Sequence, residues 1–185
     1  MSKIFALVNS KSEDDNANYL VNRIIDGAMN LSTNIISLHY VQKLHILYDY
    51  AEAKNGEDDD FSDWIDDIRS SDVFVLGITF EGKNVSNKLG IVLHRFFTEA
   101  DSLNLKGKNV IAVIASDSAG SELRDFVQSL RERFVKAGMV YVDDLIFIEE
   151  NGQHAKDNAA IDNKALIIGA SLRTNWRNYD DKAIR

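Results

Sequence analysis

Apolar residues along the chain follow two different periods. Short runs rich in Val, Ile, Leu and Phe predict β-strands, and they alternate with longer segments in which apolar residues recur every three or four positions, as in amphipathic helices. The expected strands are residues 3–9, 34–41, 72–80, 109–116 and 139–150. Strands and helices that alternate from one end to the other are typical of βαβ units on a parallel sheet.

The helical segments follow each strand in turn. They are expected over residues 14–29, 61–70, 85–97, 121–137 and 157–179. Ser121 is the expected N-cap of the fourth helix, and the fifth strand is expected to be interrupted at Asp143 and Asp144. Residues 42–57 carry mixed signals, including an Asn-Gly turn, and predict a long connection.

Five such βα units predict an α/β fold, a three-layer sandwich around a five-stranded parallel sheet. The flavodoxin-like strand order 2-1-3-4-5 is the expected topology. At 185 residues, with 45% hydrophobic and 27% charged residues, the chain is large enough to bury a core without disulfides. We therefore predict a single flavodoxin-like domain over residues 1–185.

Composition and charge exclude several classes of function. The chain contains no cysteine, which excludes disulfides, cysteine nucleophiles and thiolate-bound metals. A formal net charge of -8 argues against nucleic acids and anionic membranes as partners. The first ten residues turn polar after one short apolar run, unlike a signal peptide, so a cytoplasmic location is predicted.

Sheets of this type bind ligands beyond the carboxyl ends of their strands, here between strands one and three. The loops of interest are residues 9–18, 78–86 and 115–122. Ser10, Lys11 and Ser12, with the N–H groups that begin the first helix, suit a phosphate. Gly82 and Gly120 would let backbone approach a planar ligand, although residues of these types also suit ordinary turns and helix caps.

Other charged clusters predict no metal site. The acidic run over residues 57–60 lacks the spacing and the glycine of a calcium loop, and we interpret it as a solvated helix start. The four histidines have no metal-ligand spacing.

Motifs in these loops resemble the NADPH-dependent FMN reductase and NAD(P)H–quinone oxidoreductase family of flavodoxin-like flavoproteins, over residues 3 to about 140. The first loop carries Asn9-Ser10-Lys11-Ser12 and Asn16-Ala17 where the family has a Gly-Ser-Pro-Arg-like loop ending in Asn-Thr or Asn-Ser. The second motif stands as residues 77–81 and 85–89, followed by His94-Arg95. Further matches are Asp59-Asp60-Phe61 and Gly138-Met139.

The resemblance implies an oxidoreductase with FMN as cofactor and NAD(P)H as electron donor. It implies hydride transfer through the flavin to a quinone, another flavin or a similar small acceptor, with no dedicated catalytic residue because the cofactor carries the chemistry. A homodimer is implied as well, with exposed parts of Phe96, Phe97 or Trp176 as its face. The implied cofactor-binding residues are Ser10, Lys11, Ser12, Asn16, Ala17, Thr79, Phe80, Glu81, Gly82, Lys83, Asn84, Val85, Ser116, Asp117, Ser118 and Gly120. Lys83 is the candidate for stabilising charge on reduced flavin.

Several positions depart from the family pattern. Thr79, Glu81 and Ala17 stand where the family has a proline, a tyrosine and a hydroxyl residue. Asp14 and Asp15 lie near a helix N-terminus, which favours carboxylates and would set them against a phosphate. Two alternatives follow: a flavodoxin-like binding or scaffold domain whose flavin site is weakened or lost, and a flavodoxin-type electron carrier.

Overall fold

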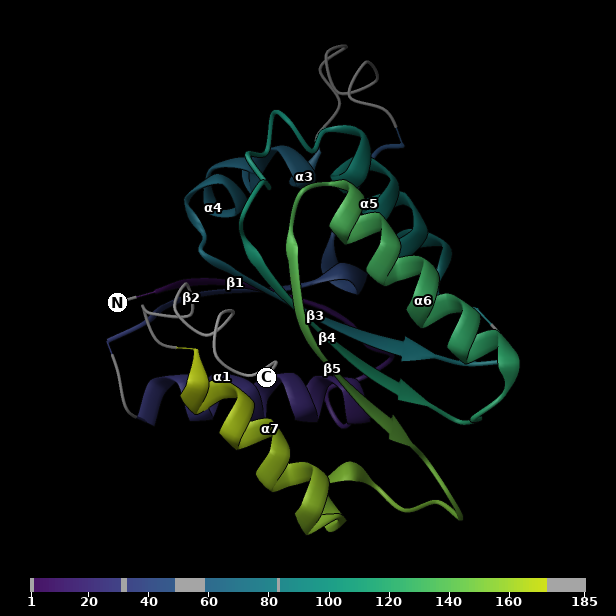
Figure 1. The fold of residues 1–185 in the computed structure, drawn as a ribbon. Helices are drawn as coiled ribbons and strands as arrows, with labels where there is room; N and C mark the ends of the chain where they lie inside the picture. Colours follow the sequence, from purple (N-terminus) through teal and green to yellow (C-terminus); the bar gives the residue numbers. More distant parts are fainter. Residues whose placement is uncertain (1, 31–32, 49–58, 83, 173–185) are drawn as a thin grey trace, which may run out of the picture.

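The expected strands pair in parallel in one sheet. The computed structural model describes residues 2–30, 33–48, 59–82 and 84–172. In this part of the chain the sheet has the order β2-β1-β3-β4-β5, which confirms the predicted topology (Figure 1). The strands are β1 (Lys3–Asn9), β2 (Ile35–Tyr40), β3 (Val73–Phe80), β4 (Asn109–Ser116) and β5 (Val140–Ile148).

Helices cover both faces of this sheet, as a parallel sheet requires. On one face lie α1 (Asn16–Asn30) and α7 (Ala159–Ser171), and on the other lie α3 (Asp60–Asp63), α4 (Ile65–Ser70), α5 (Asn87–Thr98) and α6 (Ser121–Lys136) (Figure 1). Two short 3₁₀ helices, η1 (Val41–Lys43) and η2 (Ala155–Asp157), follow β2 and precede α7. No helix in the described residues is both long and apolar enough to cross a membrane.

Side chains alternate between two buried clusters along the central strands. Phe5 and Leu7 of β1 point into the cluster under α4, α5 and α6, while Ile4, Ala6 and Val8 point into the cluster under α1 and α7. Because both faces are covered, β1, β3 and β4 are apolar almost without interruption, which explains why the sequence made them easy to recognise.

Some element boundaries differ from the expected ones. The N-cap of α6 is Gly120, and Ser121 is its first residue, so the predicted cap is wrong by one position. The helix expected over 61–70 is divided at Trp64 into α3 and α4. The interruption expected at Asp143 and Asp144 is wrong, since β5 is continuous and these residues pair with Ile111 and Ala112. A one-residue bulge precedes them instead, because Tyr141 pairs with Val110 and Asp143 with Ile111. Trp176 and residues 49–57 lie outside the described residues.

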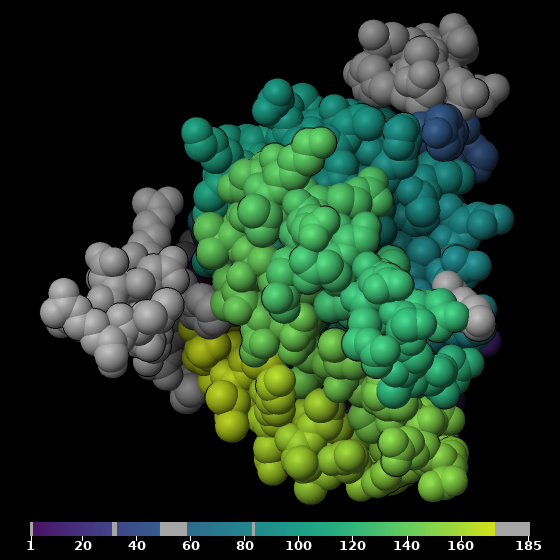
Figure 2. Space-filling model, turned by 45° about the vertical axis from the view of Figure 1, so that its right-hand side comes forward, coloured from purple at the N-terminus to yellow at the C-terminus, as the bar shows by residue number. Residues whose placement is uncertain are grey.

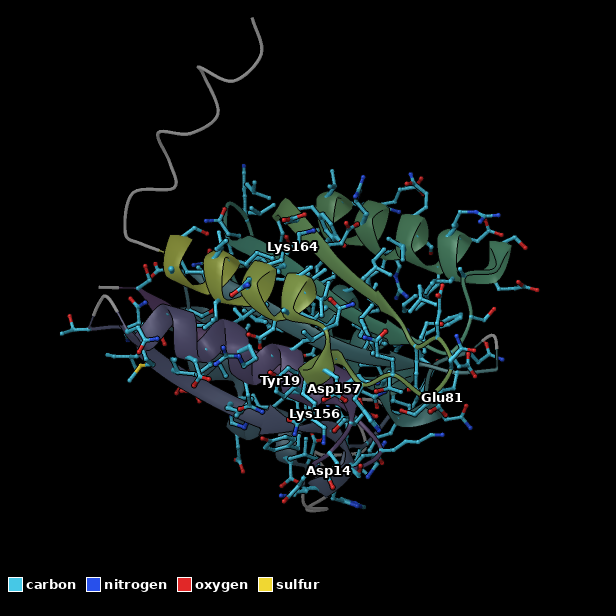
Figure 3. All side chains as sticks on the ribbon, turned by 90° about the horizontal axis from the view of Figure 1, so that it is seen from below. Asp14, Tyr19, Glu81, Lys156, Asp157 and Lys164 are labelled. Atoms are coloured by element: carbon cyan, nitrogen blue, oxygen red, sulfur yellow. The ribbon has the colours of Figure 1, made fainter. Side chains whose placement is uncertain are left out.

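Two glycines let α1 and α7 cross at close range. A Cβ at Gly169 would overlap the Ile24 carbonyl oxygen, and one at Gly27 would overlap the Leu166 carbonyl oxygen. Beside this crossing Asp162 accepts hydrogen bonds from Tyr19 Oη (2.6 Å) and from Arg23 Nε (2.6 Å). Figure 3 shows Tyr19 between the two helices. The crossing fixes α1 under the sheet, and with it the start of α1 at the carboxyl ends of the strands.

Gly169→Ala should therefore lower the free energy of unfolding by about 1–3 kcal/mol, because the added methyl group forces the helices apart. Gly90 is a matched control: it lies in α5, where a Cβ would meet no atom within 4 Å. Gly90→Ala should stabilise the protein by about 0.5–1 kcal/mol through helix propensity. Urea unfolding of both variants measures this difference, and equal effects would contradict the close crossing.

Candidate flavin-binding site

The pairing of β1 with β3 brings the first and second loops together. Asn9, the last residue of β1, lies opposite Ile78, so the chain leaves both strands at the same level of the sheet. The first loop then leads into α1 at Asn16, and β3 ends at Phe80. This boundary is the crevice that the strand order predicts.

Asp15 occupies the centre of this boundary. Its Oδ1 accepts hydrogen bonds from the Ala17 N–H (2.8 Å) and from Thr79 Oγ1 (2.7 Å), and its Oδ2 accepts one from the Lys11 N–H (3.3 Å). These donors come from the first loop, the first turn of α1 and the end of β3. We call the Lys11 N–H, the Ala17 N–H and Thr79 Oγ1 the anion site, since they all point at one negatively charged group at a helix N-terminus.

A second contact closes the crevice beside the anion site. The ammonium group of Lys11 forms an ion pair with the Glu81 carboxylate, in which Lys11 is exposed and Glu81 half-buried. Glu81 begins a tight turn in which its N–H bonds to the Asn84 carbonyl (3.1 Å) and the Asn84 N–H bonds back (3.0 Å). Gly82 has a φ of 52° in this turn, and a Cβ there would meet no atom within 4 Å. The surface over Gly82 is therefore open to a ligand.

The floor of the crevice holds a polar pair that the sequence analysis did not assign. Ser86 Oγ donates a hydrogen bond to Asn9 Oδ1 (2.7 Å) and accepts one from the Leu89 N–H (3.2 Å), so it caps α5 and fastens it to the end of β1. The available signal was an asparagine that ends an otherwise apolar strand and a serine that precedes a helix.

Several expected cofactor contacts have side chains engaged elsewhere. Asn16 donates to Glu149 Oε2 (3.0 Å) and accepts from the Ala155 N–H (2.7 Å), so it joins α1 to the segment after β5. Phe80 is buried and packs against Phe126, with ring centroids 5.1 Å apart. Their backbone groups, rather than their side chains, are what these positions can offer the crevice.

The third loop lies beside the second because β4 pairs with β3, with Ser116 opposite Phe80. Ser116 Oγ donates to the Ser118 carbonyl (2.8 Å) and accepts from the Ser118 N–H (3.2 Å), which folds the loop over the strand end. Asp117 and Ser118 are exposed, and Gly120 caps α6.

The other residues expected to bind the cofactor differ in how exposed they are. Ser10 is buried at the strand end, Ser12 is exposed, and Val85 is half-buried against the core. Lys83 lies outside the described residues.

Two motif residues far apart in the sequence form a buried ion pair away from the crevice. Asp59 Oδ2 lies 2.5 Å from Arg95 Nη1, and both side chains are almost fully buried. Arg95 also contacts Glu99 (3.0 Å) and lies over the Phe61 ring. The interpretation of the acidic run as a solvated helix start is therefore wrong for Asp59, because this carboxylate compensates a buried guanidinium instead.

Burial raises the pKa of Asp59, but hydrogen bonds from Arg95 and the Leu47 N–H and the charge of Arg95 outweigh that effect. The pKa of Asp59 is therefore held below its ordinary value of 3.8. No group of three or more His, Asp or Glu side chains in the described residues could hold a metal ion.

The strand order and an anion site at the β1–β3 boundary define a flavodoxin-like protein with a crevice suited to a phosphate-bearing ligand. The chain belongs to the NADPH-dependent FMN reductase family, whose model matches residues 2–154. It is accordingly an NAD(P)H-dependent flavin oxidoreductase with FMN as cofactor, which confirms the expected family, cofactor and class of enzyme.

Solved structures support the same fold. A putative quinone reductase from Klebsiella pneumoniae has a TM-score of 0.71 at 10% identity and covers 96% of this chain and 86% of its own. NAD(P)H:quinone oxidoreductase from Methanothermobacter marburgensis has a TM-score of 0.67 at 10% identity, and the match covers 92% of this chain and 96% of the oxidoreductase. Flavodoxin 1 from Bacillus cereus has a TM-score of 0.60 at 18% identity, covering 91% and 95%. Curated protein sequences gave no match.

The residues of the crevice fit FMN. The Asp15 carboxylate, which directly precedes α1, occupies the three donors of the anion site, and oxygen atoms of a phosphate would need donors of the same kind. The open surface over Gly82 lies on the second loop, where a planar ring could approach the backbone. Lys11, Ala17 and Thr79 would hold the phosphate, and the second and third loops would flank the ring.

Breaking the buried ion pair of Asp59 with Arg95 should destabilise the folded protein. Arg95→Met should lower the free energy of unfolding by about 3–5 kcal/mol because Asp59 is left buried without its partner. The exposed pair of Arg131 with Asp144 is the control, and Arg131→Met should cost less than about 1 kcal/mol. The double variant Asp59→Leu/Arg95→Met should recover much of the loss, since it leaves no unpaired charge. Urea unfolding measures the free energy of unfolding of each variant. A loss in Arg95→Met as small as that in Arg131→Met would contradict the role of the buried pair.

The Asp59–Arg95 ion pair should make the free energy of unfolding depend on pH in the acidic range. The pKa of Asp59 is lower in the folded protein than in the unfolded chain. Its carboxylate therefore contributes fully to the free energy of unfolding at any pH above the pKa of the unfolded chain. This contribution is lost as the pH falls through the pKa of the folded protein. The stability difference between wild type and Asp59→Asn should thus be constant at neutral pH and shrink below about pH 4. Urea unfolding across a pH series tests this, and a difference that grows in acid would contradict it.

Proposed function

We propose that this enzyme passes reducing equivalents from NAD(P)H through FMN to a quinone or a second flavin. FMN, when bound, accepts a hydride from the nicotinamide and hands electrons on to the acceptor. The observation that carries the proposal is the anion site of Lys11, Ala17 and Thr79 beside the open surface at Gly82. Family membership supports the donor and the cofactor, and the acceptor is our inference.

The chain's own residues bind and orient the ligand rather than move protons. The anion site offers two backbone N–H groups and one hydroxyl, which bind oxygen atoms without a titrating side chain. Two backbone hydrogen bonds between Glu81 and Asn84 hold these two residues of the second loop together beside the ring position.

Planar acceptors suit this surface, because the position of Gly82 has no side chain to obstruct them. A quinone or an isoalloxazine can approach the face of a ring at the exposed, side-chain-free position of Gly82. Two of the similar structures are a quinone oxidoreductase and a putative quinone reductase, which agrees with this class of acceptor. A single domain over residues 1–185, a homodimer and a cytoplasmic location stay predictions from the sequence.

The test is the visible spectrum and turnover of the purified protein. We expect flavin absorption, either as purified or after addition of FMN, and oxidation of NADPH or NADH that accelerates when a soluble quinone is added. Gly82→Trp should reduce quinone turnover at least about tenfold because the open surface is filled. Gly82→Ala is the control: it puts the same strain on a backbone with a φ of 52° but leaves the surface open, so its turnover should stay closer to that of the wild type.

A protein that neither takes up FMN nor oxidises a nicotinamide with any quinone or flavin would overturn the proposal. Reduction by a partner protein alone, and never by NAD(P)H, would instead favour an electron carrier.

A further inference from the structure

We infer that Asp15 occupies the place of the flavin phosphate and thereby makes FMN an exchangeable ligand that competes with the protein's own carboxylate. The inference rests on the proposed function, because it concerns the same crevice. It names Asp15 as the residue that determines how strongly the site prefers FMN over a flavin without a phosphate.

Asp15 occupies donors of the kind that bind a phosphate at a helix N-terminus. Both carboxylate oxygens are engaged, by the Ala17 N–H at 2.8 Å, Thr79 Oγ1 at 2.7 Å and the Lys11 N–H at 3.3 Å. These are the donors at the N-terminus of α1 nearest the β1–β3 boundary, where a phosphate would be stabilised by the helix dipole. A phosphate dianion and the carboxylate cannot share them, since like charges at this distance repel strongly.

The pairing of Lys11 also favours Asp15 over a phosphate at the anion site. Its ammonium group is the cation of the first loop, and it is paired with Glu81 rather than directed at the anion site. A phosphate that enters must therefore displace Asp15 without help from this charge. Because Asp15 is only half-buried, its side chain can turn toward solvent when a stronger anion arrives.

Asp14 provides a natural comparison. It lies one residue earlier and is exposed, and no hydrogen bond or ion pair of its side chain occurs among the described residues. Figure 3 shows Asp14 at the outer end of this loop, well separated from Glu81. Removing its charge changes the net charge as much as removing that of Asp15, but leaves the anion site filled.

The consequence is a weak preference for the phosphate. Riboflavin has no phosphate and does not compete with Asp15, whereas FMN must displace it. Wild-type protein should therefore bind FMN little more tightly than riboflavin, and FMN should exchange with solution rather than stay as a permanent cofactor. Once Asp15 loses its charge or its side chain, the same donors should favour FMN clearly.

Isothermal titration of FMN, riboflavin and inorganic phosphate into wild type, Asp15→Asn, Asp15→Gly and Asp14→Asn tests this. Both Asp15 variants should bind FMN at least about tenfold more tightly than wild type, because a repulsive contact is removed. Riboflavin affinity should change by less than about twofold, and Asp14→Asn should change FMN affinity by less than about threefold, since an exposed charge is screened. Inorganic phosphate should bind Asp15→Gly detectably more tightly than wild type.

Two results would overturn the inference. One is FMN affinity in both Asp15 variants that is no higher than in wild type, including the case in which no variant binds FMN. The other is an equal gain in Asp14→Asn, which would make the effect one of net charge. Circular dichroism and thermal unfolding verify that each variant is folded. The proposed function fails on a different measurement, namely absence of NAD(P)H oxidation in the presence of FMN, so the two failures are distinguishable.

Discussion

The parallel pairing of β1 with β3 is the constraint on which the site depends. It joins two segments about seventy residues apart and aligns Asn9 with Ile78, so that the first loop and the end of β3 leave the sheet together. Without that pairing the N–H groups of Lys11 and Ala17 would not face the hydroxyl of Thr79. Everything that makes the crevice bind an anion follows from this one register.

The helix layer then fixes where α1 begins. Gly77 of β3 has no Cβ, and one placed there would press on Val21 of α1, so the helix lies directly against the strand. Gly27 and Gly169 hold α1 against α7 on the other side. Because the helix is fixed from two sides, its first turn cannot move away from the end of β3. The donors of the anion site are therefore already in place before a ligand arrives. Figure 2 shows the green residues of α6 above the yellow residues of α7, the two helices that cover opposite faces of the sheet.

An acidic protein that binds a phosphate must do so by local means. With a formal net charge of -8, the chain has no basic field to attract an anion, and backbone N–H groups supply the binding instead. Some of its charged side chains pair within the fold, as Lys11 does with Glu81 and Arg95 with Asp59. Asp15 completes this pattern, because the protein fills its own anion site when no stronger anion is present.

The sequence by itself determined the strands, the strand order and the three loops at the carboxyl end of the sheet. Strands buried on both faces carry continuous apolar runs, so β1, β3 and β4 could be recognised from composition alone. The loop motifs also indicated the family and its cofactor correctly. The strands and the loops are local features that neighbouring residues along the chain encode, whereas the strand order followed from the fold class that this alternation predicts.

Only the tertiary structure decided which side chains meet. Asp14 and Asp15 look equivalent in the sequence, yet one is exposed and the other accepts three hydrogen bonds, one of them from a hydroxyl 64 residues away. Asp59 and Arg95 belong to separate sequence motifs, yet they form one ion pair in the fold. The side chain of Asn16, expected to contact the cofactor, donates a hydrogen bond to Glu149 instead. The physical reason is that a hydrogen bond or ion pair depends on distances across the sheet, which the pattern of neighbours along a chain does not contain.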